Sequence, residues 1–87
     1  MQICEKKKLI MKILGASIVD LRGEKSQFML ASENDISCSI ISMIERGLKD
    51  PQLTTFFKIA EALNMKPSEL LREIENQLPK DFSLIDK

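Results

Sequence analysis

The chain has 87 residues, the length of one small domain with a single hydrophobic core. Apolar residues make up 44% and charged residues 30%, and thirteen basic side chains balance thirteen acidic ones, so the composition excludes an intrinsically disordered chain. The sequence contains no histidine, and its two cysteines, Cys4 and Cys38, lie far apart. This excludes the usual zinc motifs and every histidine-dependent catalytic triad.

No apolar run approaches the roughly 18 residues that span a bilayer, so no transmembrane segment is expected. The basic cluster at residues 6–8 is followed by Lys12 rather than by the long apolar stretch and small-residue cleavage site of a secretory signal. The sequence also lacks a phosphate-binding glycine loop and carboxylates paired for catalysis. We therefore expect a cytoplasmic protein that is not an enzyme and needs neither a metal nor a cofactor.

The N-terminal part of the chain predicts an amphipathic helix that ends near Lys25. Its apolar residues recur at intervals of three and four, which places them on one helical face. These residues are Ile10, Leu14, Ile18 and Leu21. A second, short helix over residues 27–33 follows Ser26, whose hydroxyl suits an N-cap. Leu30 and Ala31 of this helix are expected to face the interior.

Ser37 is the N-cap candidate of a third helix, and Gly47 ends it because glycine readily adopts the left-handed conformation that often follows a helix. The residues of this region that are expected to point inward are Ile36, Ile41 and Ile44. Asp35 lies in the preceding turn, where a left-handed residue is usual and aspartate is tolerated at modest cost. The turn is short enough to cross the two helices at a large angle, as in a DNA-binding helix-turn-helix.

Two further helices follow Pro51. The fourth carries an apolar series and stops near Asn64, which tolerates positive φ; the series is Leu53, Phe56, Phe57, Ala60 and Leu63. Pro67 suits the first position of the fifth helix, whose apolar residues are Leu70, Leu71 and Ile74. Pro79 ends that helix, and no segment predicts a strand. The expected fold is all-α, with a five-helix domain over residues 1–77 and a C-terminal tail over residues 78–87.

From residue 14 to residue 74 the sequence resembles the Xre/Cro-type helix-turn-helix family, which includes phage repressors, restriction-modification controller proteins and many antitoxins. The order and spacing of five segments carry the resemblance: LR at 21–22, SQ at 26–27, LA at 30–31, ISMIERG at 41–47 and LTTFFKIAEALNMKPSELL at 53–71. The resemblance implies a five-helix, lambda-repressor-like DNA-binding domain. Its third helix, over residues 37–46, enters the major groove, usually from a dimer that reads two half-sites.

The resemblance also implies roles for individual residues. Gln27 matches the glutamine that contacts a phosphate and braces the third helix. Arg22 and Glu45 match a buried ion pair that joins the first helix to the third, so we assign both residues to structure. The residues expected at the DNA are Ser26, Gln27, Ser37, Cys38, Ser39, Ser42, Met43, Arg46 and Lys49. The chain's polarity supports phosphate contacts by Lys25, Arg46 and Lys49, because residues 1–25 carry six basic and three acidic side chains whereas residues 59–87 carry four and six.

The second helix departs from the family pattern. The family has a longer connection between Lys25 and Ser26, with an inward-facing apolar residue that is missing here. We expect Phe28 or Met29, which stand where the family commonly has glutamates, to fill that gap; the alternative is an exposed patch for a partner. Asn34 also replaces an apolar residue, which weakens the local core.

The third helix departs at its DNA face, where Cys38, Ser39 and Met43 replace the long polar side chains that make bidentate contacts to bases. Direct readout is therefore expected to be weak, with serines bonding either base and with Cys38 and Met43 touching thymine methyl groups. Specificity then depends more on half-site spacing and DNA deformability. Cys38 has no resolving cysteine near it in sequence, so an incidental small residue is a better interpretation than a redox switch.

These features predict a DNA-binding transcriptional regulator, a repressor or autoregulator that binds a short palindromic operator as a homodimer. Dimerisation is expected to use Leu71 and Ile74 of the fifth helix. The apolar residues of the tail, Leu78, Phe82, Leu84 and Ile85, are expected to pack across the interface or back onto the first helix. The alternative is an antitoxin or other interaction module that mainly binds a protein partner such as a toxin, with secondary DNA binding.

Overall fold

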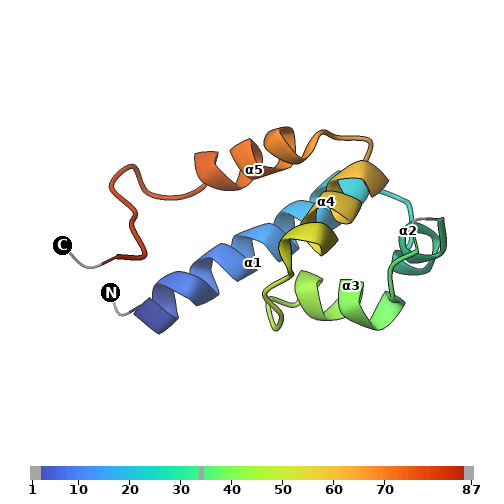
Figure 1. The fold of residues 1–87 in the computed structure, drawn as a ribbon, viewed down its shortest axis with the longest axis horizontal. Coiled ribbons are helices and arrows are strands. Elements are labelled where there is room, and N and C mark those ends of the chain that lie inside the picture. Colours follow the sequence, from blue (N-terminus) through green and yellow to red (C-terminus); the bar gives the residue numbers. More distant parts are fainter. Residues whose placement is uncertain (1–2, 34, 86–87) are drawn as a thin grey trace.

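The computed structural model describes residues 3–33 and 35–85, and within these residues it contains five helices and no strand (Figure 1). The helices are α1 (Ile3–Arg22), α2 (Gln27–Glu33), α3 (Cys38–Glu45), α4 (Leu53–Ala62) and α5 (Pro67–Asn76). The predicted all-α, five-helix class is confirmed. α1 ends before the expected Lys25 because Gly23 leaves the helix at a φ of 58°. The expectation for Asn34 lies outside the described residues.

The helix boundaries follow the predicted caps. The hydroxyl of Ser26 accepts a hydrogen bond from the backbone N–H of Met29 (3.1 Å), and that of Ser37 accepts one from Ile40 (3.5 Å). α2, α3 and α4 are each followed by a residue with positive φ: Asp35, Gly47 and Asn64. The next N–H then returns to a carbonyl of the helix, as when Ile36 donates to Ala31 (3.1 Å). This is the arrangement that satisfies the last carbonyls of a helix.

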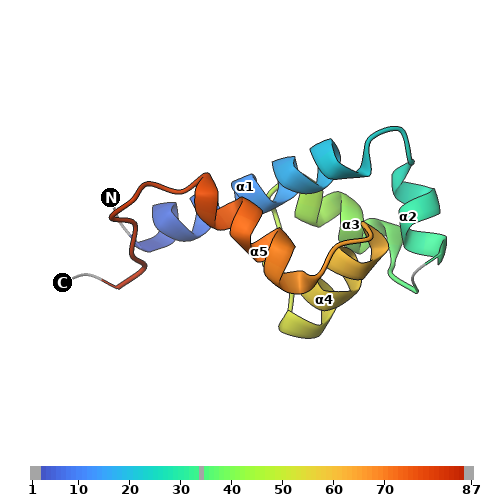
Figure 2. The same ribbon diagram turned by 90° about the horizontal axis from the view of Figure 1, so that it is seen from above.

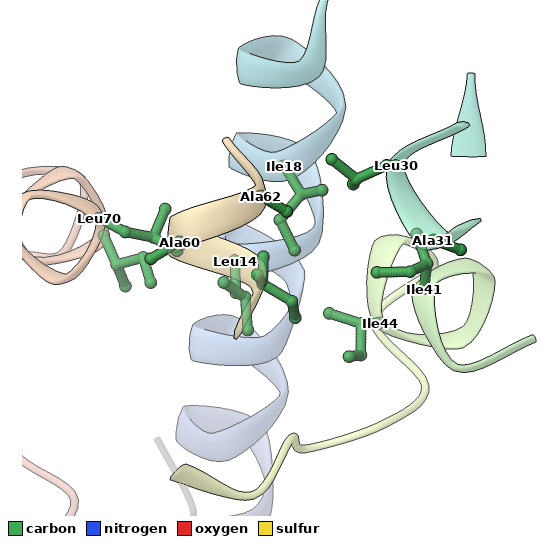
Figure 3. Close-up of a cluster of buried hydrophobic side chains, with 11 residues drawn as sticks. Leu14, Ile18, Leu30, Ala31, Ile41, Ile44, Ala60, Ala62 and Leu70 are labelled. Carbon is green, nitrogen blue, oxygen red and sulfur yellow. The ribbon is translucent and has the colours of Figure 1, made fainter. Parts of the chain in front are cut away.

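All five helices contribute to one core. Its buried residues are Leu14, Ile18, Leu30, Ala31, Ile41, Ile44, Ile59, Ala60, Ala62, Leu70 and Ile74. α1 runs through the middle of the close-up in Figure 3, with α5 on one side and α2 and α3 on the other. The inward faces predicted for α2 and α3 are confirmed. On α1, Leu14 and Ile18 are buried as predicted, whereas Leu21, in the last turn, is exposed.

The apolar series predicted for α4 does not lie on one buried face. Ile59, Ala60 and Ala62 are buried, whereas Leu53 and Phe57 are 71% and 48% exposed. The first turn of α4 lies at the edge of the helix cluster (Figure 2), so its apolar side chains extend past the core. α4 therefore presents two apolar faces, one to the core and one to the surface.

The expected packing of Phe28 and Met29 is also wrong. They are 70% and 47% exposed, because α2 turns Leu30 and Ala31 toward the core and leaves its outer face to these two residues. Neither side chain fills the gap that the shortened connection leaves. The exposed-patch interpretation is the one compatible with their positions.

Gly15 determines how closely α1 approaches α3. A Cβ atom at this buried position would lie 2.5 Å from the carbonyl oxygens of both Ile44 and Glu45. A glycine inside a helix lowers the stability of the helix by about 1 kcal/mol relative to alanine. Gly15 therefore weakens α1 locally but allows this close contact. The last turn of α3 is thereby seated directly on the backbone of α1.

We expect Gly15→Ala to lower the free energy of unfolding by about 1–3 kcal/mol, because the new methyl group overlaps backbone atoms that cannot rotate away. Urea denaturation followed by circular dichroism measures the change. Ala16→Gly, at the neighbouring exposed position, gives the size of the propensity effect alone. A Gly15→Ala variant more stable than the wild type would show that α1 and α3 do not make this contact.

Candidate nucleic-acid interface

α2 and α3 form a helix-turn-helix beside the C-terminal half of α1 (Figures 1 and 2). Asp35 adopts the left-handed conformation in the turn, with a φ of 55°, as predicted. α3 packs on the core through Ile41 and Ile44, both fully buried. Because side chains three and four residues apart share a helical face, residues 39, 42, 43 and 46 are left on the side of α3 that faces away from the core.

The structure brings most of the predicted DNA-facing residues together. Six of them line one shallow, open hollow on the surface: Gln27, Cys38, Ser39, Ser42, Met43 and Arg46. Gln27 comes from the start of α2 and the other five from α3 and its C-cap. The hollow is therefore a surface that α2 and α3 build jointly.

The other three predicted residues are exposed outside this hollow. The hydroxyls of Ser26 and Ser37 already accept hydrogen bonds as helix caps, so they can still donate to a phosphate oxygen. Lys49 is exposed in the segment after α3, close in sequence to the exposed Arg46. Among the described residues, no three His, Cys, Asp or Glu side chains gather as a metal-binding group.

A network around Glu45 holds α3 in place. The Glu45 carboxylate accepts hydrogen bonds from Arg22 Nε (2.7 Å), Arg22 Nη2 (3.2 Å) and Gln27 Nε2 (2.6 Å). Arg22 Nη1 also donates to the carbonyl oxygen of Lys25 (2.7 Å). The exposed fractions of the Arg22 and Glu45 side chains are 18% and 4%. The predicted partners thus meet in a largely buried pair that joins α1, α2 and α3.

The electrostatics of this pair favour the charged state of Arg22. The hydrogen bonds to Glu45, reinforced by its charge, raise the pKa of Arg22 above its ordinary value, although burial acts in the opposite direction. Glu45 ends α3, where the helix dipole disfavours a negative charge. The two nearby donors offset that effect, so the carboxylate can stay buried.

The structure buries some of the predicted dimer residues in the core of the single chain and leaves others exposed. Ile74 belongs to the core of the single chain, with 4% of its surface exposed, whereas Leu71 is 55% exposed. Leu78 packs against the core, and Phe82 is half-buried. Leu84 and Ile85 are exposed. The C-terminal tail lies near the N-terminal end of α1 in both views (Figures 1 and 2).

An apolar groove between α1, α4 and α5 was not predicted from the sequence. Its volume is about 470 Å³, and exposed Leu53, Phe57 and Leu71 stand among its lining residues. Ile10, Leu14, Phe56 and Ile74 also line it. The signal for this groove was the spacing of four between residues 53 and 57, which defines an apolar face on α4 separate from that of the buried Ile59 and Ala62.

We expect Glu45→Gln to reduce the free energy of unfolding by about 3 kcal/mol, since it leaves the Arg22 guanidinium largely buried without a counter-charge. The control is Asp50→Asn, which breaks the exposed Lys7–Asp50 pair (3.8 Å) and should cost less than about 1 kcal/mol. Urea denaturation measures both. Equal losses for the two variants would contradict a special role for Glu45.

Comparison with known proteins assigns the family of the domain. Residues 23–70, more than half of the chain, match the helix-turn-helix family of the Xre/Cro type. The match begins directly after α1, ends within the first half of α5 and includes both helices that line the hollow. Searches of curated proteins and of solved structures found no match. No described helix has the length and apolar character needed to cross a membrane. The helix-turn-helix geometry, the hollow on α3 and the sequence match agree: the chain belongs to the Xre/Cro-type helix-turn-helix family of DNA-binding regulators.

Proposed function

We propose that this protein is a dimeric, sequence-specific transcriptional regulator of the cytoplasm, a repressor or autoregulator that binds a short palindromic operator through α3. The observation that carries the proposal is the gathering of the predicted base-facing residues on one outer surface of α3. The Glu45 network fixes that helix to α1 and α2 without using any outward-facing residue of α3. The outer surface is thus both rigidly placed and available to the major groove.

Phosphate contacts around α3 would position the domain on DNA. One N–H of the Gln27 amide donates a hydrogen bond to Glu45. The second N–H of the amide can donate a hydrogen bond to a phosphate oxygen. Arg46 and Lys49 are exposed at the C-terminal end of α3 and just beyond it. Such contacts supply affinity and register, whereas the residues within α3 supply the sequence preference.

The groove between α4 and α5 is the surface we assign to a second copy of the chain. Leu53, Phe57 and Leu71 form an exposed apolar cluster, the kind of surface that marks an interface. Exposed Arg72 and Glu75 lie within four residues of Leu71 on α5. Two antiparallel copies of α5 can therefore pair these opposite charges across a two-fold axis while burying the leucines.

Two-fold symmetry of the protein predicts two-fold symmetry of the operator. A dimer of this family reads half-sites about one helical turn apart, or roughly 34 Å, on the same face of the DNA. Each α3 would then enter a successive major groove. The inverted repeat and the dimer are consequently proposed together, because each half-site of the repeat needs its own copy of α3.

The second candidate function is an antitoxin or another interaction module with a protein partner such as a toxin. The observation in its favour is the exposure of Phe28 and Met29 on the outer face of α2. A partner that copurifies in stoichiometric amounts and binds without DNA, with loss of binding in Phe28→Ser, would support this function. Retention of full partner binding by Phe28→Ser would remove α2 from consideration.

The DNA-binding proposal predicts that an inverted repeat is enriched from genomic fragments by the purified protein. In fluorescence anisotropy, Arg46→Ala should weaken binding to all sequences and reduce the slope of log K against log salt by about 1, because one phosphate contact is lost. Ser39→Arg should change the preferred base at one position of each half-site, because arginine contacts guanine bidentately.

Lys80→Ala is the matched control for Arg46→Ala, because it removes an exposed positive charge from the tail. It should leave both affinity and salt slope nearly unchanged. Weak binding to every sequence, with no response to Ser39→Arg, would overturn sequence-specific recognition by α3.

The dimer proposal predicts that Leu71→Asp converts the protein to a monomer in sedimentation velocity, since a charge would enter the centre of the interface. Met29→Asp, a change of an exposed apolar residue on α2, is the control and should leave the dimer intact. A chain that ends at Asn76 tests the tail separately. If it dimerised as well as the full chain, residues 77–87 would have no part in the interface, and a dimeric Leu71→Asp variant would exclude the groove.

A further inference from the structure

We infer that Met43 is a specificity-determining residue that reads the methyl group of a thymine in each half-site. This inference rests on the proposed function, because it assumes that α3 enters the major groove. It specifies which chemistry of the groove the helix recognises. The argument depends on the side chains of the α3 hollow and on what each of them is able to contact.

The part of the hollow formed within α3 itself carries no charge and no long hydrogen-bonding side chain. Between the N-cap and Glu45, α3 reads CSIISMIE, and its residues in the hollow are Cys38, Ser39, Ser42 and Met43. Arginine contacts to guanine and asparagine or glutamine contacts to adenine need two donors or acceptors on one long side chain. None of these four residues supplies them.

Met43 is the large apolar side chain of this surface, and 40% of it is exposed. Two residues that line the hollow with it are small: Ser39, one turn before it, and Ser42. Small neighbours allow the helix backbone to approach the base edges, while the flexible thioether adapts its shape to the surface it meets. The apolar feature that the major groove offers to such a side chain is the thymine C5-methyl group.

Arg46 lies in the same hollow but in a different position relative to the DNA. It follows the last residue of α3 as the C-cap, whereas the base contacts of a helix-turn-helix come from residues within the recognition helix, which lies in the major groove. Its guanidinium is therefore suited to the phosphate backbone. This division leaves the base-reading part of the surface to the serines, Cys38 and Met43.

The test replaces thymine by deoxyuridine, which removes the methyl group and leaves the base-pairing unchanged. On the sequence enriched by the wild-type protein, each thymine is replaced in turn, and affinity is measured by fluorescence anisotropy at constant salt. One position per half-site should show a loss of about fourfold, the effect of one methyl group buried, and about fifteenfold when both half-sites carry the change. Met43→Ala should bind the thymine and deoxyuridine sites equally.

Two variants separate this role from general effects on binding. Met29→Ala, which changes the exposed methionine of α2, should keep the full thymine-to-deoxyuridine ratio. Arg46→Ala should weaken both sites and also keep the ratio. Circular dichroism of each variant confirms that the helices are intact.

The outcomes distinguish this inference from the proposed function. Specific DNA binding without a thymine position that responds to deoxyuridine, or an unchanged ratio in Met43→Ala, would overturn the role of Met43 and leave the DNA-binding function standing. If no sequence were enriched and no DNA were bound, the proposed function would fail and the role of Met43 with it.

Discussion

The carboxylate of Glu45 is the point at which three helices meet, and the placement of α3 depends on it. Arg22 reaches it from α1 and Gln27 from α2, with the closest contacts at 2.7 and 2.6 Å. Below it, Gly15 lets the carbonyls of the same turn rest on the backbone of α1. A carboxylate at a helix C-terminus and largely removed from water is stable only with such partners. The last turn of α3 is therefore fixed by both its side chain and its backbone.

This arrangement separates the structural residues of α3 from those that face outward. Ile41, Ile44 and Glu45 hold the helix, while Ser39 and Met43 contribute nothing to the core. The outer side chains can consequently change without loss of the fold. The buried residues of α3 therefore match the family pattern, while its outward-facing residues depart from it. The short side chains on this outer face are therefore not a sign of a weakened fold.

Local features were predictable because their causes lie within a few residues. Ser26 and Ser37 cap the helices that follow them, and Asp35 and Asn64 adopt the left-handed conformation expected of helix ends. The pairing of Arg22 with Glu45 and the composition of the α3 surface came from the resemblance to a family. The roles of these surface residues at the DNA stay predictions, whereas their positions follow from the packing of α3 on the core through Ile41 and Ile44.

Features that depend on distant contacts were not predictable from periodicity. Gly15 has no turn or cap to explain it, because its reason is the backbone of α3, thirty residues further along the chain. Leu53 and Phe57 satisfied the helical spacing as well as Ile59 does, and only the packing of α4 decides which face is buried. The apolar character of Phe28 likewise does not show whether its side chain faces the core or the solvent. Spacing identifies an apolar face but does not say what covers it.

The two candidate functions use different apolar surfaces of the described residues. A second copy on Leu53, Phe57 and Leu71 would leave Phe28 and Met29 of α2 uncovered. α2 has seven residues and begins with Gln27, the residue we place at a phosphate. A protein that covered α2 would crowd this contact while leaving the dimer surface untouched. Partner binding and dimerisation are thus compatible, whereas partner binding and DNA binding would compete, so a toxin-like partner on α2 would release the operator.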